Sequence, residues 1–313
     1  MQRVTTLTVN PAVDVAATVD RVAADEKLRC RDPRRDPGGG GINVARAMLR
    51  LGGEARAVFA AGGSPGQLLE RLLSDEGVQS AAVRVEGYTR ENVTIYEDHS
   101  ERQYRFIMPG AEVDGDEVSR LVEAALEGDP AYLVASGSLP PGVPTDFYAG
   151  VAERARERGT RVVLDTSGEA LSAGVRGGVH LVKPNLRELG QLAGRDVSED
   201  PEQEAAAREL VESERAEIVV VSLGAAGVLV VTAGGRERIP APTVPIRSKV
   251  GAGDSTVAGI TLSLARGDDV GTAVRFGVAA GAAAVMTPGT ELCRREDAER
   301  LFARLRRDGG SRG

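Results

Sequence analysis

The sequence predicts an α/β fold, with a mostly parallel central β-sheet flanked by helices and a small second sheet apart from the core. Short apolar runs of buried-strand type alternate with helical stretches along most of the 313 residues. Two segments interrupt this alternation with a two-residue period, which is typical of β-structure. No repeat, low-complexity tract or linker divides the chain, so we expect one domain over residues 1–313.

Strands and helices are expected in alternating order. The strands are predicted at Val4–Val9, Ala55–Ala60, Ala131–Ala135, Val162–Asp165, His180–Val182 and Ile218–Ser222. The helices are predicted at Ile42–Leu51, Gln67–Asp75, Thr145–Glu157, Glu202–Ser213 and Thr256–Ala265. In Gln67–Asp75 the leucines recur on one side, as in an amphipathic helix. Asp32 to Gly41 is the stretch richest in loop-forming residues, and we expect disorder from Asp308 to Gly313.

The two segments that break the pattern are expected to form a small sheet from about residues 12–36 and 88–108. Val13–Arg31 has alternating residues and no clear helical period. Asn92–Glu97 and Gln103–Ile107 are expected to pair as a hairpin around Asp98–Glu101. Such a sheet at the mouth of an α/β domain can act as a lid that excludes water from a substrate. Its apolar outer face can also support a homodimer.

Composition excludes several classes of protein. The net charge of −7 argues against a nucleic-acid-binding chain, which needs a basic face. No apolar run approaches the roughly 20 residues of a membrane helix, and Met1–Asn10 lacks the apolar stretch of a signal peptide. Cys30 and Cys293 lack metal spacing, and His99 and His180 are too few for a histidine cluster. We therefore expect a cytoplasmic protein without nucleic-acid or membrane partners.

The strongest local signal is Val250–Ser255, which precedes a helix of small residues. Gly251, Ala252 and Gly253 allow backbone N–H groups to point at one anion, where the helix dipole also favours negative charge. Asp254 follows in the first helical turn, where a carboxylate beside an anion hole can accept a proton from a hydroxyl. Taken alone, Asp254 is more typical of a helix N-cap.

A second signal is the run of four glycines in Pro37–Arg46, directly before a helix. Glycines cost conformational entropy, so we expect them where the backbone touches a ligand, with Asn43 facing the same site. A flexible loop fits less well, because a helix starts immediately afterwards.

Two later segments follow apolar strands. In Lys183–Glu188, Asn185 and Glu188 can hold water around Mg²⁺, although proline and an early acidic residue are also common at helix starts. Ser222–Gly227 is equally typical of a simple turn. Lysine is rare, because of 39 basic residues only Lys27, Lys183 and Lys249 are lysines. Each of them lies in or beside a segment that is singled out here on other grounds.

Near the N-terminus, Asp14 is either a turn residue or an acceptor for sugar hydroxyls. Lys27, Arg29 and Arg90 are candidates for binding a substrate phosphate, the alternative being a solvated charged surface. The chain has no Gly-x-x-x-x-Gly-Lys-[Ser/Thr] loop, no complete dinucleotide fingerprint after its first strand and no protein-kinase signature.

Together and in this order, these segments resemble the ribokinase-like sugar kinases of the PfkB family, from about Thr6 to Phe302. The pair Gly38–Arg46 and Gly251–Ser255 is highly specific for that family. The chain is most similar to the phosphosugar branch, and within it to the 6-phosphofructokinases. The motifs that carry this closer resemblance are Asn10–Asp14, Thr89–Asn92, Gly137–Gly142, Lys183–Asn185 and, for the 6-phosphofructokinases, Lys27–Cys30.

The resemblance implies a ribokinase-like fold and a role for each matching residue. Asp254 would be the catalytic base, and Gly251, Ala252 and Gly253 would form the anion hole. The sugar would be bound by Asp14, Gly39, Asn43 and Ser138, and its phosphate by Arg90, Lys27 and Arg29. The nucleotide would be bound by Lys183, Asn185, Ser222, Gly224, Gly227 and Ser248. Mg²⁺ would be held through water by Asn185 and Glu188, and the family's phosphosugar members are commonly dimers through the lid.

Two positions depart from the wider family pattern. Many 1-phosphofructokinases and tagatose-6-phosphate kinases have a lysine where this chain has Gly40, and Thr287 stands near the end of the helix expected to border the adenine. The glycine version favours ATP-dependent phosphorylation of fructose 6-phosphate at its 1-hydroxyl. Tagatose 6-phosphate and fructose 1-phosphate are the alternative substrates. A non-catalytic sugar-phosphate sensor is an alternative of another class.

Overall fold

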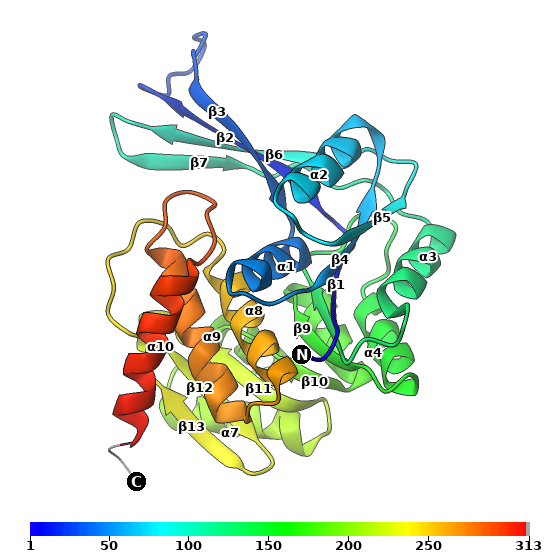
Figure 1. The fold of residues 1–313 in the computed structure, drawn as a ribbon, viewed down its shortest axis with the longest axis vertical. Coiled ribbons are helices and arrows are strands. Elements are labelled where there is room, and N and C mark those ends of the chain that lie inside the picture. Colours follow the sequence, from blue (N-terminus) through cyan, green and yellow to red (C-terminus); the bar gives the residue numbers. More distant parts are fainter. Residues whose placement is uncertain (311–313) are drawn as a thin grey trace.

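The computed structural model describes residues 1–310 and arranges their strands in two sheets, a large one inside the α/β body and a small one beside it (Figure 1). The large sheet has nine strands in the order β13-β12-β11-β10-β9-β8-β1-β4-β5. These strands are β1 (Val4–Thr8), β4 (Arg56–Ala61), β5 (Ser80–Arg84), β8 (Tyr132–Ser136), β9 (Arg161–Asp165), β10 (Val179–Val182), β11 (Ala216–Ser222), β12 (Val228–Thr232) and β13 (Gly235–Ile239).

From β5 across to β11, neighbouring strands pair in parallel, whereas β11, β12 and β13 pair antiparallel at one edge. The central strands are buried apolar runs because helices cover both faces of the sheet. The predicted class, a mostly parallel sheet flanked by helices, is therefore confirmed, and each predicted strand lies within two residues of an observed one.

The helices divide into two layers, each with its own hydrophobic core. One layer contains α1 (Gly40–Arg50), α2 (Gly63–Asp75), α8 (Ala252–Arg266), α9 (Val270–Val285) and α10 (Arg295–Gly310). The opposite layer contains α3 (Gly115–Leu126), α4 (Phe147–Glu157), α5 (Gly168–Gly174), α6 (Leu186–Ala193) and α7 (Asp200–Glu212). Two short 3₁₀ turns, Val175–Gly177 and Gly224–Ala226, complete the elements.

The small sheet has the strand order β3-β2-β6-β7, with β2 (Ala12–Val19), β3 (Arg31–Gly38), β6 (Arg90–Glu97) and β7 (Arg102–Phe106). β2 pairs antiparallel with β3 and parallel with β6, and β6 pairs antiparallel with β7. The predicted hairpin around residues 98–101 is thus confirmed. This sheet extends over the edge of the body where α8 and α1 begin (Figure 1).

Two expectations about loops were wrong. Asp32–Gly41 is not a loop, because β3 runs to Gly38 and α1 starts at Gly40. Prolines are tolerated in β3 because it is an edge strand. The expected disorder does not begin at Asp308, since α10 continues to Gly310, and residues 311–313 of that expectation lie outside the described residues. Within residues 1–310 no helix is long and apolar enough to cross a membrane.

Candidate active site

The start of α8 presents backbone N–H groups that no side chain caps among the described residues. Gly251 is the N-cap residue and has φ 75° and ψ −1°, a left-handed conformation that favours glycine. A Cβ at this position would also lie only 2.6 Å from Leu292 Cδ2. Among the described residues no side chain caps this helix, so its first N–H groups, around Ala252 and Gly253, remain available to an anion.

Asp254 lies in the first turn of α8 but does not act as its N-cap. Its Oδ2 accepts a hydrogen bond of 2.9 Å from Asn43 Nδ2 at the start of α1. The ordinary explanation of this aspartate as a helix cap therefore does not apply. Two helix starts separated by 211 residues in sequence instead place a carboxylate beside an anion-binding turn.

The surroundings of Asp254 raise its pKa to about 7. Burial is the main cause, and the negative charge of Asp165 adds to it, while the Asn43 hydrogen bond and the positive charge of Lys183 oppose it. The side chain keeps some exposure toward the cleft. A carboxyl group with this pKa can accept a proton near neutral pH and release it afterwards.

Arg46 holds Asn43 in place, although its position in the sequence indicates no such role. Its guanidinium makes a two-point contact with Glu76, with Nε–Oε2 at 2.8 Å and Nη2–Oε1 at 2.6 Å. Its Nη1 also donates to Pro37 O at 2.9 Å and to Asn43 Oδ1 at 3.2 Å. The arginine side chain is only 1% exposed. This fixed fork orients the Asn43 amide so that its Nδ2 faces Asp254.

The glycine run before α1 passes close to two strand ends. A Cβ at Gly38 would lie 2.5 Å from Asp14 Oδ2, and one at Gly40 would collide with Ser136 Oγ at the end of β8. The glycines thus allow the backbone to approach these side chains closely, and the run is not a flexible loop; its predicted contact with a ligand stays a prediction. Gly39 lies between these positions with φ 116° and partial exposure.

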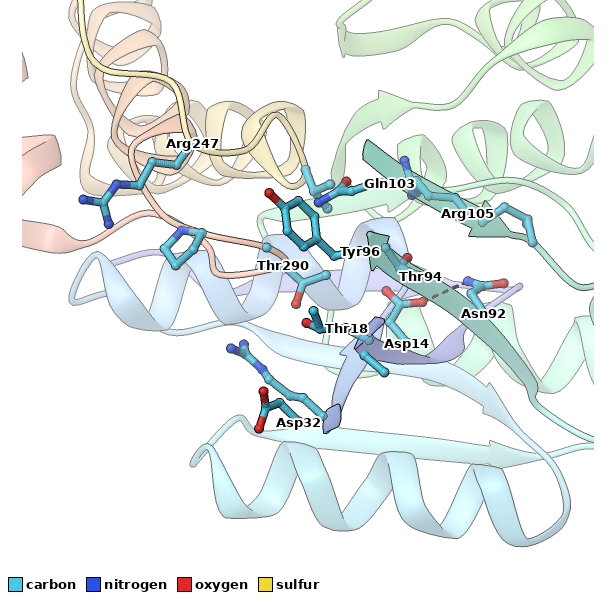
Figure 2. A pocket seen from close by; sticks show the side chains of 17 residues that line it. Asp14, Thr18, Asp32, Asn92, Thr94, Tyr96, Gln103, Arg105, Arg247 and Thr290 are labelled. Carbon is cyan, nitrogen blue, oxygen red and sulfur yellow. Dashed lines mark hydrogen bonds between the residues drawn. The ribbon is translucent and has the colours of Figure 1, made fainter. Parts of the chain in front are cut away.

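Asp14 lies on the face of β2 that is turned toward the cleft, where Figure 2 shows its bond to Asn92. Its Oδ1 accepts a hydrogen bond of 2.9 Å from Asn92 Nδ2 on the adjacent strand. Burial raises the pKa of Asp14, although the Asn92 bond and the charges of Arg90 and Arg105 oppose that shift. Burial outweighs these opposing effects, so the pKa of Asp14 is raised on balance although two arginines lie nearby.

Arg90 is anchored beside Asp14 by backbone oxygens. Its guanidinium donates to Asn10 O at 3.0 Å, to Met108 O at 3.3 Å and to Pro11 O at 3.4 Å. Burial lowers the pKa of Arg90, and the charge of Asp14 counters this effect. Because a guanidinium has five N–H donors, two remain for an anionic ligand.

Lys27 and Arg29 do not lie near Arg90 within one chain. They are exposed in the connection between β2 and β3, at the end of the small sheet where Arg31 bonds to Asp20 and Asp98. Arg90 is paired with Ala12 at the opposite end of β2. The seven residue steps from Ala12 to Val19 span about 23 Å at the usual rise of a strand. The three predicted phosphate ligands therefore do not form one site in a single chain.

Lys183 lies at the end of β10 and forms an ion pair with Asp165 at the end of β9, with Nζ–Oδ1 at 3.2 Å. Burial by itself would lower the pKa of Lys183, but the attraction of Asp165, with smaller effects of Asp254 and Glu188, leaves it raised. The ammonium group also lies next to Gly253, where an added Cβ would be 3.7 Å from it. Lys183 thus remains charged beside the anion-binding turn. Asp165 was missed, although its place at the end of a predicted strand was a usable signal.

Asn185 and Glu188 form a reciprocal capping box at the start of α6. Asn185 Oδ1 accepts from Glu188 N at 2.9 Å, and Glu188 Oε2 accepts from Asn185 N at 2.9 Å. The helix-start alternative from the sequence is thus correct locally. Glu188 Oε1 is left to hold a water of a hydrated Mg²⁺, so the pair fits the metal through water only. Among residues 1–310, no group of three or more His, Cys, Asp or Glu can hold a metal directly.

The family model for pfkB family carbohydrate kinases matches residues 7–297 of this chain. The chain belongs to this family. Two curated relatives are named ATP-dependent 6-phosphofructokinase isozyme 2. The one from Mycobacterium tuberculosis (strain H37Rv) is 46% identical over 302 residues, covering 96% of this chain and 89% of the relative. The one from Escherichia coli (strain K12) is 45% identical over 309 residues, covering 98% and 100%.

Solved structures agree with this assignment. The crystal structure of phosphofructokinase-2 from Escherichia coli in complex with fructose-6-phosphate has a TM-score of 0.92 and 44% identity, and the match covers 98% of this chain and 100% of that one. Ribokinase from Thermotoga maritima, at 22% identity and a TM-score of 0.79, shares the fold. The predicted ribokinase-like fold, family and carbohydrate-kinase activity are therefore confirmed.

The remaining residues predicted from the family resemblance differ in their exposure and in their hydrogen bonds. Ser138 is exposed and accepts from Asn10 Nδ2 at 3.1 Å. Ser222 lies beside Asn185, bridged to it across the sheet edge, and Gly224 is exposed in the 3₁₀ turn that follows. Gly227 closes that turn and is buried, in line with the simple-turn alternative. Nucleotide contacts by these residues stay predictions.

Ser248 and Thr287 are tied into the loops of this pfkB-family cleft. Ser248 Oγ donates to Gly289 O at 2.7 Å and accepts from Val250 N at 3.2 Å. Thr287 Oγ1 bonds to Ala284 O and Glu291 O, and the residue is 1% exposed. Thr287 therefore offers no free hydroxyl to an adenine.

A cavity of about 410 Å³ separates the small sheet from the loops on either side of α8 and α9 (Figure 2). Asp14, Asn92 and Arg105 line it from the sheet, and Arg247 and Thr290 line it from the body. Asp254 is not among the residues that line it, so this cavity is the space beneath the small sheet and not the whole cleft. Its size is adequate for a small ligand.

Proposed function

We propose that this kinase transfers the γ-phosphoryl group of ATP to the 1-hydroxyl of fructose 6-phosphate, giving fructose 1,6-bisphosphate and ADP. The observation that carries the proposal is Asp254, a carboxylate with a pKa of about 7 held beside the open N–H groups of α8. The substrate is suggested by the names of the relatives, which are 45–46% identical over nearly the whole chain. Tagatose 6-phosphate and fructose 1-phosphate remain alternative substrates.

In this mechanism the 1-hydroxyl oxygen attacks the γ-phosphorus while its proton passes to the Asp254 carboxylate. The bond from the γ-phosphorus to the bridging oxygen breaks, and ADP leaves with that electron pair. Negative charge on the transferred group faces the N–H groups of Gly251, Ala252 and Gly253, the dipole of α8 and the ammonium of Lys183. Asn43 orients the base, and Asp14 accepts hydrogen bonds from sugar hydroxyls.

Mg²⁺ bound with ATP would supply charge neutralisation of the phosphates. In this chain Glu188 would hold it through water, with Asn185 fixing the position of the Glu188 carboxylate. Asn185, Ser222 and Gly224 lie at adjacent strand ends and would contact the nucleotide.

The small sheet, residues 12–36 and 88–108, would act as a lid over the sugar. Its inner face lines the cavity, whereas Val93, Ile95, Tyr104 and Phe106 point to the opposite face by strand alternation. Phe106 is 52% exposed, which suits contact with a second chain. A homodimer through this face would bring Lys27 and Arg29 of the partner to the phosphate that Arg90 binds.

The proposal of an oligomer is supported by a related protein, since one structure of phosphofructokinase-2 from Escherichia coli is of a tetrameric inhibited form. The dimer of this chain and its cytoplasmic location stay predictions.

The test is ADP release by the purified protein with ATP and Mg²⁺ on a panel of fructose 6-phosphate, tagatose 6-phosphate, fructose 1-phosphate, fructose and ribose. We expect the highest kcat/KM on fructose 6-phosphate. Asp254→Asn serves as the control for contaminating kinases. A preference for another phosphosugar would overturn the substrate but not the mechanism. Binding of sugar phosphate without turnover would favour the non-catalytic sensor.

A further inference from the structure

A hydrogen bond between distant segments connects the small sheet to the loop that follows α9. Asp36, on β3, is 6% exposed, and its Oδ2 accepts from Thr290 Oγ1 at 2.7 Å. The two residues are 254 positions apart in sequence. Arg34 forms an ion pair with the Asp36 carboxylate, with Nε 2.8 Å from Asp36 Oδ2. Its Nη1 lies 3.9 Å from Oε1 of Glu291, the residue after Thr290.

On the body side, this loop supports the anion-binding turn. Gly289 O accepts the Ser248 hydroxyl, and Ser248 Oγ in turn accepts Val250 N, one residue before the N-cap of α8. Leu292 packs against Gly251 closely enough to exclude a Cβ there. The position of residues 287–294 therefore bears directly on the N–H groups that face the transferred phosphoryl group.

On the sheet side, Asp36 is next to the sugar-binding elements. It pairs in register with Asp14 across β2 and β3, and it stands two residues before Gly38, whose backbone lies against the Asp14 carboxylate. The chain then enters α1, where Asn43 holds Asp254. A shift of β3 would therefore move both the acceptor for the sugar and the partner of the base.

We propose that Asp36 and Thr290 are positioning residues that hold the sugar-binding strand and the anion-binding turn in a single relative geometry. Neither residue needs to touch the reacting atoms. Reaction requires that the hydroxyl and the phosphoryl site be aligned within a fraction of an ångström, and a charge-assisted hydrogen bond across the cleft serves that purpose. The catalytic part of this proposal rests on the function proposed above, whereas the mechanical coupling does not.

The test compares Thr290→Val, which keeps the shape but removes the hydroxyl, with Thr290→Ser, which restores it. Thr272→Val is the matched control, because Thr272 Oγ1 makes the same kind of bond, 2.6 Å to Asp269 Oδ2, at the start of α9. Asp36→Asn, of equal shape, is the second variant and weakens the contact from the other side.

The first readout is amide hydrogen exchange of the chain without ligands. We expect Thr290→Val to speed exchange about tenfold in both residues 31–38 and residues 248–255, while Thr290→Ser and Thr272→Val leave them unchanged. Faster exchange in residues 287–294 alone would overturn the coupling.

The second readout is kcat/KM for the sugar phosphate that the wild-type chain phosphorylates best. Thr290→Val should lower it about tenfold with rescue by Thr290→Ser. Looser segments with unchanged kcat/KM would overturn the positioning role. If the wild-type protein turned over no sugar of the panel, the proposed function would fail, and hydrogen exchange would still decide the coupling.

Discussion

Replacing Asp254 by asparagine should abolish phosphoryl transfer and at the same time stabilise the folded protein at alkaline pH. The substitution keeps the shape of the side chain and an oxygen that can accept the 2.9 Å hydrogen bond from Asn43. It removes the negative charge that the site destabilises. Loss of activity together with a gain in stability is expected for a residue that serves catalysis at the expense of the stability of the folded protein.

The size of the effect follows from the pKa. The pKa of Asp254 rises from 3.8 to about 7 in the folded protein, so the folded state binds this proton more tightly than the unfolded state does. Stability contributed by this group is present below pH 4 and is lost as the pH rises toward 7. A shift of three units corresponds to at most about 4 kcal/mol. For a chain of this length, each kcal/mol changes Tm by about 1.5 °C.

We therefore expect Asp254→Asn to raise Tm at pH 8 by a few degrees, with the gain shrinking toward pH 5. Thermal unfolding would be measured at equal protein concentration, because association also affects Tm. Asp269→Asn is the control, since hydrogen bonds from Thr272 lower the pKa of Asp269 and its replacement should not stabilise at pH 8. In parallel, kcat should fall at least a hundredfold, and wild-type kcat/KM should decline below about pH 7.

A lower Tm for Asp254→Asn at pH 8, or a difference that does not depend on pH, would refute the raised pKa. Near wild-type kcat would refute the assignment of the base, whatever the stability.

Two further predictions concern the phosphate of the sugar. Arg90→Ala should raise KM for fructose 6-phosphate by at least tenfold and hardly change KM for fructose; equal effects in steady-state kinetics would remove Arg90 from the phosphate site. At a fructose 6-phosphate concentration near the wild-type KM, Lys27→Ala should be nearly inactive because its KM is raised, and Asp254→Asn should be inactive because it lacks the base. When the two variants are mixed and reassociated, they should recover about a quarter of wild-type activity at that concentration, because half of the random dimers then contain one complete site. No recovery in dimers shown by mass to be mixed would place Lys27 outside the partner's site.

Much of the fold could be predicted because its signals are local. Buried parallel strands are short apolar runs, and helices between them have their own period, so six of the nine strands of the main sheet were predicted from local signals. The strands β5, β12 and β13, which lie toward the two edges of that sheet, were not predicted. The limits of β3 and α1 were harder, since prolines and glycines are typical of loops. Only the edge position of β3 and the close approach of Gly40 to Ser136 explain those residues.

The catalytic base and the anion hole could be proposed from the sequence because a single motif, Gly251–Asp254, combines glycines at a helix start with a carboxylate. The site was not predictable where a residue acts through a partner far along the chain. Arg46 contacts Glu76 and Asn43, Asp165 pairs with Lys183, and each looks like an ordinary charged residue in the sequence. Their roles come from tertiary contacts that no spacing rule encodes.

The predicted phosphate ligands could not be placed from one sequence for a different reason. The site that they imply would be formed by two chains. The register of β2 and β6 separates Arg90 from the connection that carries Lys27 and Arg29 by about the length of a strand. If all three bind one phosphate, the lid of one chain must close the site of another. Recognition of a phosphorylated sugar would then depend on assembly, whereas the base, the anion hole and Lys183 come from a single chain. Dissociation should accordingly raise KM for the sugar phosphate far more than it impairs nucleotide binding, a separation that dilution experiments can measure.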